Sequence, residues 1–318
     1  MYHRPARITG TNRPLRLDGQ VIPMWETLLH MADNRGMSDP LLKTFRTPIA
    51  VAAAALICWS GLYAFQRPFK QYPGIEHPEE PLPPDWNKKA EWAFARLMFP
   101  PGPNNGYEGR DADWHLGYSL WTQDYPPADR NFSRAVRRLT RISTRSVEQA
   151  VNLEDGDEVY NWPWVYAVQV GEWGLTDAEA KVLREYLLRG GFFMADDFHG
   201  SYEWSMFEMR IKKVFPDRPI VDIPDNDPIF HTVYDLDDRY QIPGAQHVYQ
   251  GCKNCNEGGR GAHWRAIRDD KGRIMVAISY NSDIGDSWEY ADVPEYPEKY
   301  SALGIRIGVN YIVYAMTH

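Results

Sequence analysis

The sequence predicts an α/β protein in which a mostly parallel, doubly wound sheet follows one transmembrane helix and an irregular N-terminal tail. Two patterns predict this class: one long apolar run without charges near the N-terminus, and a later alternation of short β-rich runs with helical runs. Continuous apolar strands are typical of a sheet that helices cover on both faces. We therefore divide the 318-residue chain into a tail at 1–47, a transmembrane helix at 48–65, a proline-rich linker at 66–91 and an α/β domain at 92–318.

The apolar run extends from Pro48 to Phe65 and contains no charged residue. Eighteen residues at a helical rise of about 1.5 Å per residue span about 27 Å, which is close to the thickness of a hydrocarbon core. Trp59 and Tyr63 lie toward one end, where interfacial aromatic residues are favoured. A cleaved signal peptide is the alternative, but residues 62–64 make a mediocre cleavage site. We interpret the run as a membrane span.

The charge distribution predicts the orientation of the chain. Residues 1–47 carry seven Lys and Arg against four Asp and Glu, so the net charge of −8 for the whole chain leaves −11 on residues 66–318. A basic flank favours the cytoplasmic side. We therefore expect a cytoplasmic N-terminus and a domain on the far side of the membrane; for a bacterial inner membrane, that side is the periplasm. Such an acidic domain would be repelled by nucleic acid, so no nucleic-acid partner is expected.

The segments that flank the span differ in composition from the domain. The tail has no sustained hydrophobic period, and such a segment is expected to become ordered only against a partner. Six prolines within residues 66–90 predict a stiff, extended spacer. Both observations favour a chain that contacts other subunits of a membrane complex.

The domain is expected to alternate between strands and helices. A Thr-Asp-Ala-Glu capping box at 176–179 predicts a helix start, and two glycines at 190–191 predict its end. Apolar and amphipathic runs predict the remaining elements. The expected strands are 94–99, 145–147, 165–170, 192–195 and 274–280, and the expected helices are 128–141, 176–188, 202–215 and 302–316.

Several long motifs in this domain occur together in a fixed order. They are DWHLGYSLWTQDYPPADRNF (113–132), YLLRGGFFMADDFHG (186–200), FEMRIKKVFPDR (207–218), DNDPIFHTVYDL (225–236), VAISYNSDIGDSWE (276–289) and LGIRIGVNYIVYAMTH (303–318). With these motifs, roughly residues 92–318 resemble a bacterial family catalogued as domain of unknown function 4159. The resemblance implies a flavodoxin-like or class I glutamine-amidotransferase-like α/β domain and implies no activity.

Polar residues follow two of the expected strands directly, after residues 195 and 280. The carboxyl ends of parallel strands are where α/β folds bind ligands, so we expect an acidic cleft there. Carboxylates with a histidine can bind Mg²⁺ or Ca²⁺ or act as acid and base. The alternative is that they cap helices and close turns. The candidate cleft residues are Asp196, Asp197, His199, Asn281 and Asp283.

Amidotransferase chemistry is not expected, because it needs a thiolate nucleophile at the turn after a strand. That turn reads Ala195-Asp196-Asp197-Phe198, and no cysteine stands near the end of an expected strand. The sequence also lacks a G-x-S-x-G elbow, a Walker loop and a G-x-G-x-x-G motif. We therefore assign no catalytic residue and expect no cofactor.

Cys252 and Cys255 are the only closely spaced cysteines. Asn256 follows the pair where a c-type haem would need histidine, so haem attachment is not expected. In a periplasmic domain the simplest interpretation is a loop-closing disulfide. The alternative is a zinc site that also uses His247 and His263.

Together these features predict a non-catalytic, single-span accessory subunit that stabilises a larger bacterial membrane complex by contacts on both sides of the bilayer. An energy-transducing complex such as a photosynthetic reaction-centre–antenna assembly is one candidate host. The expected partners are membrane-protein subunits and the lipid bilayer. The alternative is a membrane-tethered periplasmic enzyme or ligand-binding domain that works in the acidic cleft.

Overall fold

The computed structural model describes residues 16–17, 20–21, 68–102, 113–251 and 261–318. The chain forms two compact units, residues 1–61 and 62–318. In the first unit, the two-residue strands β1 (Arg16–Leu17) and β2 (Gln20–Val21) pair antiparallel. Within the described ranges no helix has the length and apolar character needed to cross a membrane. The predicted span at 48–65 lies outside these ranges.

The second unit is built on one seven-stranded sheet with the strand order β4-β3-β5-β6-β9-β8-β7. The first five strands of this order are parallel, and β8 pairs antiparallel with both β9 and β7. Counted along the chain, the parallel strands follow the order 2-1-3-4-5, one of the common orders of doubly wound folds. The strands are β3 (Ala95–Met98), β4 (Gln149–Asn152), β5 (Trp164–Ala167), β6 (Phe192–Ala195), β7 (Val221–Asp222), β8 (His263–Arg268) and β9 (Ile274–Tyr280).

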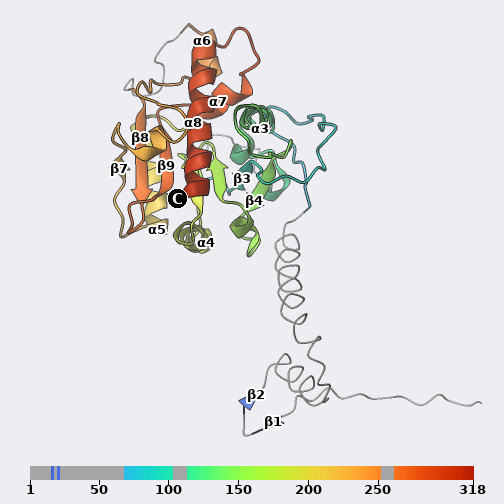
Figure 1. The fold of residues 1–318 in the computed structure, drawn as a ribbon, viewed down its shortest axis with the longest axis vertical. Coiled ribbons are helices and arrows are strands. Elements are labelled where there is room, and N and C mark those ends of the chain that lie inside the picture. The colour runs from blue at the N-terminus through green and yellow to red at the C-terminus, as the bar shows by residue number, and fades with distance from the viewer. Residues whose placement is uncertain (1–15, 18–19, 22–67, 103–112, 252–260) are drawn as a thin grey trace, which may run out of the picture. The chain divides into compact units, whose positions relative to one another are not determined.

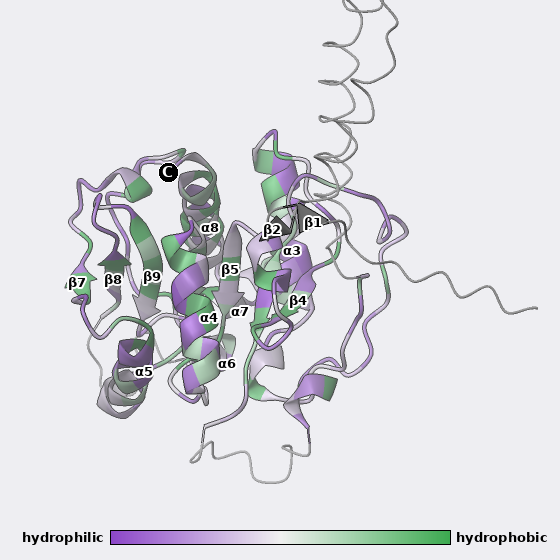
Figure 2. Cartoon of the chain, turned by 90° about the horizontal axis from the view of Figure 1, so that it is seen from below, coloured by the Kyte–Doolittle hydropathy of each residue, from purple (hydrophilic) through white to green (hydrophobic). Residues whose placement is uncertain are grey.

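Helices cover both faces of this sheet, which confirms the predicted α/β class. One buried core contains Leu183 of α4 and Phe207 of α5, and the other contains Phe132 of α3 and Ile307 of α8. Figure 1 shows α8 lying across the sheet, and Figure 2 shows hydrophobic and hydrophilic residues alternating along α4. The α-helices are α3 (Pro127–Leu139), α4 (Asp177–Leu188), α5 (Gly200–Val214), α6 (Ala245–Tyr249), α7 (Ile284–Glu289) and α8 (Glu298–Thr317); short 3-10 helices cover Trp114–Leu116, Leu120–Thr122, Glu158–Asn161 and Pro228–Phe230.

The expected elements and the observed ones agree closely at β6 and β9, and the capping box of α4 is confirmed in both of its hydrogen bonds. The strand expected at 145–147 is wrong. The guanidinium of Arg145 donates to the carbonyls of Val147 and Glu148, so these groups are used locally. Pairing with β3 begins only at Gln149.

The proline-rich segment 68–91 does not form a free spacer, in contrast to the prediction. The backbone N–H of Tyr72 donates to the hydroxyl of Tyr125 at 3.1 Å. The guanidinium of Arg130, on α3, donates to the carbonyl of Pro81 at 3.0 Å. The segment donates one of these bonds and accepts the other, and together they hold it against the domain.

Helix α7 owes its position to aromatic packing. The rings of Phe132 and Trp288 stack with centroids 4.2 Å apart, which joins α3 to α7. Gly308 of α8 lies so close that an added Cβ would come within 2.4 Å of the Phe132 ring. The packing of α7 matters for function, because several acidic side chains lie on this helix or at its start.

Candidate metal centre

The carboxylate of Asp196 comes directly after β6 and is fully buried. Its Oδ2 accepts hydrogen bonds from the Tyr166 hydroxyl at 2.9 Å and from the backbone N–H groups of Ile284 and Gly285 at 3.0 Å each. Burial, together with the neighbouring Asp197 carboxylate, raises the pKa of Asp196 to about 7. Asp196 therefore fixes the start of α7 to the end of β6.

Asp197 points into a polar network at the same edge of the sheet. Its φ of 51° is in the left-handed region, which is uncommon for a residue with a side chain. Its Oδ2 accepts from the Gln169 amide at 2.7 Å, and its Oδ1 lies 2.9 Å from Nε2 of His199. Although burial opposes the charged imidazolium, the hydrogen bond to Asp197 raises the pKa of His199.

The residues after β9 stabilise the starts of three helices. The Asn281 Oδ1 accepts from the backbone N–H of Gly200 at 3.0 Å, which caps α5. Asp283 caps α7, since its Oδ1 accepts from the N–H of Asp286 at 2.8 Å. The Oδ2 of Asp286 in turn accepts from the N–H of Ala245, at the start of α6, at 2.6 Å. Asn281 and Asp283 therefore act as helix caps, and they also lie in the predicted cleft, so the two interpretations of these residues are both correct.

Asp124 brings a further carboxylate to this place from the loop before α3. The residue is 1% exposed, and its Oδ2 has no hydrogen-bond partner among the residues that the structure describes. The residue has a φ of 60°, and its carbonyl accepts the N–H of Ala128. Arg96 stabilises this loop, because its guanidinium donates to the carbonyls of Trp121 and Gln123 at 3.2 and 3.0 Å.

We call five carboxylates at this edge of the sheet the acidic cluster: Asp124, Asp197, Asp283, Asp286 and Glu289. The ligand oxygens of Asp124, Asp197 and Asp283 all lie within 4.8 Å of one another, and those of Asp124, Asp286 and Glu289 do so as well. Four of the five residues are buried, and Asp286 is partly buried. Within the part of the chain that the structure describes, no Lys or Arg forms an ion pair with any of them.

This crowding disfavours the ionised carboxylates. Burial, and then the negative charges of their neighbours, raise the pKa values of Asp124, Asp283 and Asp286 well above those of ordinary aspartates. Buried charges in proteins are normally paired or coordinate a metal. The cluster is therefore short of positive charge, and a divalent cation would supply it.

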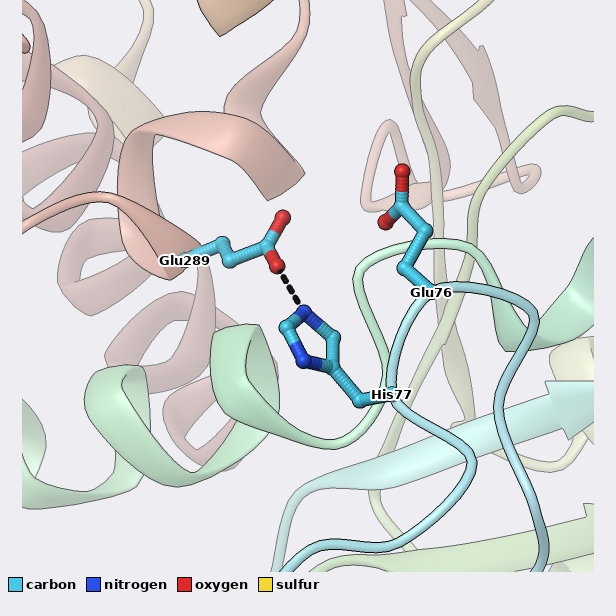
Figure 3. A group of neighbouring side chains, drawn as sticks. All are labelled: Glu76, His77 and Glu289. Atoms are coloured by element: carbon cyan, nitrogen blue, oxygen red, sulfur yellow. Dashed lines mark hydrogen bonds and ion pairs between the residues drawn. The ribbon is translucent and has the colours of Figure 1, made fainter.

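A neighbouring group adds a histidine from the proline-rich segment. His77 Nε2 lies 2.5 Å from Oε1 of Glu289, and Glu76 belongs to the same set of mutually close ligand atoms. Figure 3 shows Glu76 and His77 reaching from one loop toward Glu289 at the end of α7. The hydrogen bond to Glu289 raises the pKa of His77. The second oxygen of Glu289, Oε2, is buried without a partner.

The structure brings the five candidate cleft residues to one edge of the sheet, but gives them different surroundings. Asp197 and Asp283 belong to the acidic cluster. Asp196 and Asn281 instead accept hydrogen bonds from backbone N–H groups. His199 contacts Asp197 through its Nε2. Sequence reasoning missed Asp124, Glu76 and His77. Asp124 stands before a proline-initiated helix and so has the sequence signature of a cap, and the other two lie in a segment expected to be a spacer.

The cysteine pair does not enter this centre. Cys252 and Cys255 lie outside the described residues, so the predicted disulfide and the alternative zinc site both stay predictions. Of the two histidines proposed as zinc ligands, His247 lies on α6 and His263 lies on β8, where its ring stacks on Tyr280 with centroids 5.5 Å apart.

The fold and the centre define an α/β domain with a carboxylate-rich site at the carboxyl edge of its parallel strands. The chain belongs to the family described as domain of unknown function (DUF4159), whose model matches residues 113–316. This confirms the resemblance seen in the sequence motifs. No curated protein matches the chain.

Proposed function

We propose that this domain binds a divalent cation through Asp124, Asp197 and Asp283. The observation that carries the proposal is the set of three buried carboxylates whose ligand atoms lie within 4.8 Å of one another. Mg²⁺ and Ca²⁺ are hard cations that prefer carboxylate oxygens. Asp124 Oδ2 supports this choice further, because a buried carboxylate oxygen without a hydrogen bond is costly unless something binds it.

The surrounding hydrogen bonds support a site that is formed before the cation arrives. Gln169 and His199 orient Asp197, and the N–H of Asp286 orients Asp283. Such supporting partners are typical of metal ligands. Gly244 leaves the room that Asp283 needs, since an added Cβ there would lie 2.8 Å from the Asp283 Oδ2.

Calorimetric titration of the chelator-treated full-length chain with MgCl₂ and CaCl₂ tests the proposal. We expect one cation per chain at this site, and we expect Asp197→Asn and Asp283→Asn each to weaken binding at least tenfold. Asp237→Asn, at an exposed aspartate outside the cluster, serves as the control. Equal cation binding by the wild type and both cluster variants would overturn the proposal.

The role of an accessory membrane subunit stays a prediction. It depends mainly on the tail and the span, which lie largely outside the described residues. Cation binding and the subunit role are compatible, because a bound cation can stabilise the domain whether the chain is a membrane-tethered binding protein or a subunit of a complex. Isolation of the native chain from its membrane, followed by identification of the proteins that accompany it, tests the subunit role.

A further inference from the structure

We propose that this edge of the sheet holds a two-cation centre, in which Glu76, His77 and Glu289 bind a second cation beside the one at Asp124, Asp197 and Asp283. The inference rests on the proposed cation-binding function and extends it to a second metal of different chemistry. Zn²⁺ is the ion that fits the second set best, because it is bound by both imidazole nitrogen and carboxylate oxygen.

Three sets of ligand atoms follow one another without a break. Asp124 belongs both to the set with Asp197 and Asp283 and to the set with Asp286 and Glu289, and Glu289 also belongs to the set with Glu76 and His77. In the described ranges, no set of ligand atoms within 4.8 Å of one another joins Asp197 to Glu289 or to His77. One cation cannot contact the whole row, so cations that occupy both ends of it must number at least two.

Two residues that belong to two sets each, Asp124 and Glu289, have a carboxylate oxygen that lacks a hydrogen-bond donor in the described residues. Glu289 is 8% exposed, and no described residue forms a hydrogen bond with its Oε2. Asp124 is 1% exposed, and its Oδ2 likewise has no partner in the described ranges. Asp124 belongs to the set of the first cation and Glu289 to the set of the second, and the two carboxylates meet in the set that they form with Asp286. A cation at each set would give these two oxygens the partner that the hydrogen-bond network does not supply.

The two ends of the row differ in chemistry. Around Asp197 and Asp283 the ligand atoms are all carboxylate oxygens, which suit Mg²⁺ or Ca²⁺. Around Glu289, an imidazole joins two carboxylates, which suits Zn²⁺ and other first-row metals. Three protein ligands leave a fourth position of a tetrahedral ion open to water, as in catalytic zinc sites.

Entry of the second cation requires a small local change. His77 Nε2 and Glu289 Oε1 are 2.5 Å apart, whereas two ligands of a tetrahedral zinc ion are separated by about 3.3 Å. His77 lies on a loop and its side chain is 34% exposed, so it is free to move by this amount. The cation would then tie the segment before β3 to α7, which are 212 residues apart in the sequence.

The metal content of the full-length chain tests the inference. The chelator-treated protein is loaded with CaCl₂ and ZnSO₄, separated from free ions and measured by mass spectrometry. We expect one Ca²⁺ and one Zn²⁺ per chain. His77→Gln keeps a hydrogen-bond donor for Glu289, and we expect it to weaken Zn²⁺ binding at least tenfold with Ca²⁺ retained. His231→Gln, at an exposed histidine outside the centre, should retain both ions.

Cobalt gives an independent readout, since Co²⁺ in place of Zn²⁺ reports its ligands by visible absorption. We expect an absorption band in the wild type that is lost in His77→Gln. Unchanged Zn²⁺ content and Co²⁺ spectrum in His77→Gln would overturn the second site. If Ca²⁺ binds through Asp197 and Asp283 but no second ion binds, the two-cation centre is wrong and the proposed function stands. If neither ion binds, both fail.

Discussion

Arg96 on β3 and Asp129 on α3 form an ion pair that is completely buried. The guanidinium Nε donates to the two carboxylate oxygens at 2.9 and 3.1 Å. The same guanidinium binds two carbonyls of the loop that ends at Asp124. The pair therefore links the first parallel strand, the first helix of the domain and the acidic cluster.

Arg96→Met is expected to destabilise the protein by about 3–5 kcal/mol, because removal of one partner leaves the other charge buried and unpaired. Chemical denaturation followed by tryptophan fluorescence measures this free energy of unfolding. Arg134→Met removes an exposed ion pair with Asp292 and should cost less than about 1 kcal/mol. Equal effects of the two substitutions would contradict the role assigned to Arg96.

Asp124→Asn is expected to raise stability without cations and to lose most of the stabilisation that cations give the wild type. Without cations, it removes one of several mutually repelling buried charges, so the free energy of unfolding should rise by about 1–3 kcal/mol. With Ca²⁺ at 100 times its dissociation constant, the wild type should gain about 2.7 kcal/mol, and the variant should lose most of that gain. Thermal unfolding with chelator and with CaCl₂ measures both effects, and a variant that gains as much as the wild type would exclude Asp124 as a ligand.

Glu203→Gln is expected to remove part of the pH dependence of stability. Burial raises the pKa of Glu203 to about 7 from its usual value of 4.5. Between these pH values the folded state holds a proton that the unfolded state has lost, so this group lowers stability as pH rises through the window. The variant should gain on the order of 2 kcal/mol relative to the wild type between pH 4.5 and pH 8.

Urea unfolding across this pH range measures the difference for Glu203→Gln. Gln retains an acceptor for the N–H of His199, which the Glu203 Oε2 binds at 2.6 Å. Glu208→Gln on the same helix, where the glutamate is paired with Lys212 at the surface, is the matched control. Parallel pH profiles for the wild type and Glu203→Gln would refute the prediction.

Gly285→Ala is expected to weaken cation binding at least tenfold. An added Cβ would lie 2.2 Å from the Asp124 Oδ2 and 2.8 Å from the Tyr166 hydroxyl, so the carboxylate must be displaced. Calorimetry with CaCl₂ measures the loss of affinity. Gly261→Ala adds the same methyl group at a position where no atom of the described residues lies within 4 Å, and it should bind Ca²⁺ as the wild type does.

The sequence allowed prediction of those parts of the fold that local pattern determines. β6 and β9 are mostly apolar runs that become strands buried throughout except at Tyr280, and the capping box sets the start of α4. β8 reads His-Trp-Arg-Ala-Ile-Arg, without such a run, and it was missed. β8 lies next to the short outer strand β7, and its Arg265 and Arg268 are only partly buried, so charge is tolerated there.

The site was predictable only in part, for a related reason. Asp197 and Asp283 follow recognisable strands, and the rule that ligands bind at strand ends brings them together. His77 and Glu289 meet across 212 residues of chain, and no period or spacing relates them. Their contact depends on how the segment before β3 folds back on α3, which is a matter of tertiary packing.

The short antiparallel margin of the sheet has a consequence for the behaviour of the protein in solution. β7 contains only two residues, Val221 and Asp222, and its aspartate is paired with Arg265 of β8. A long, flat outer strand would offer its unpaired backbone groups to a second molecule. β7 offers only two exposed residues, one of them charged, so a second molecule can form few backbone hydrogen bonds with it. This edge of the sheet therefore disfavours strand exchange and fibre growth.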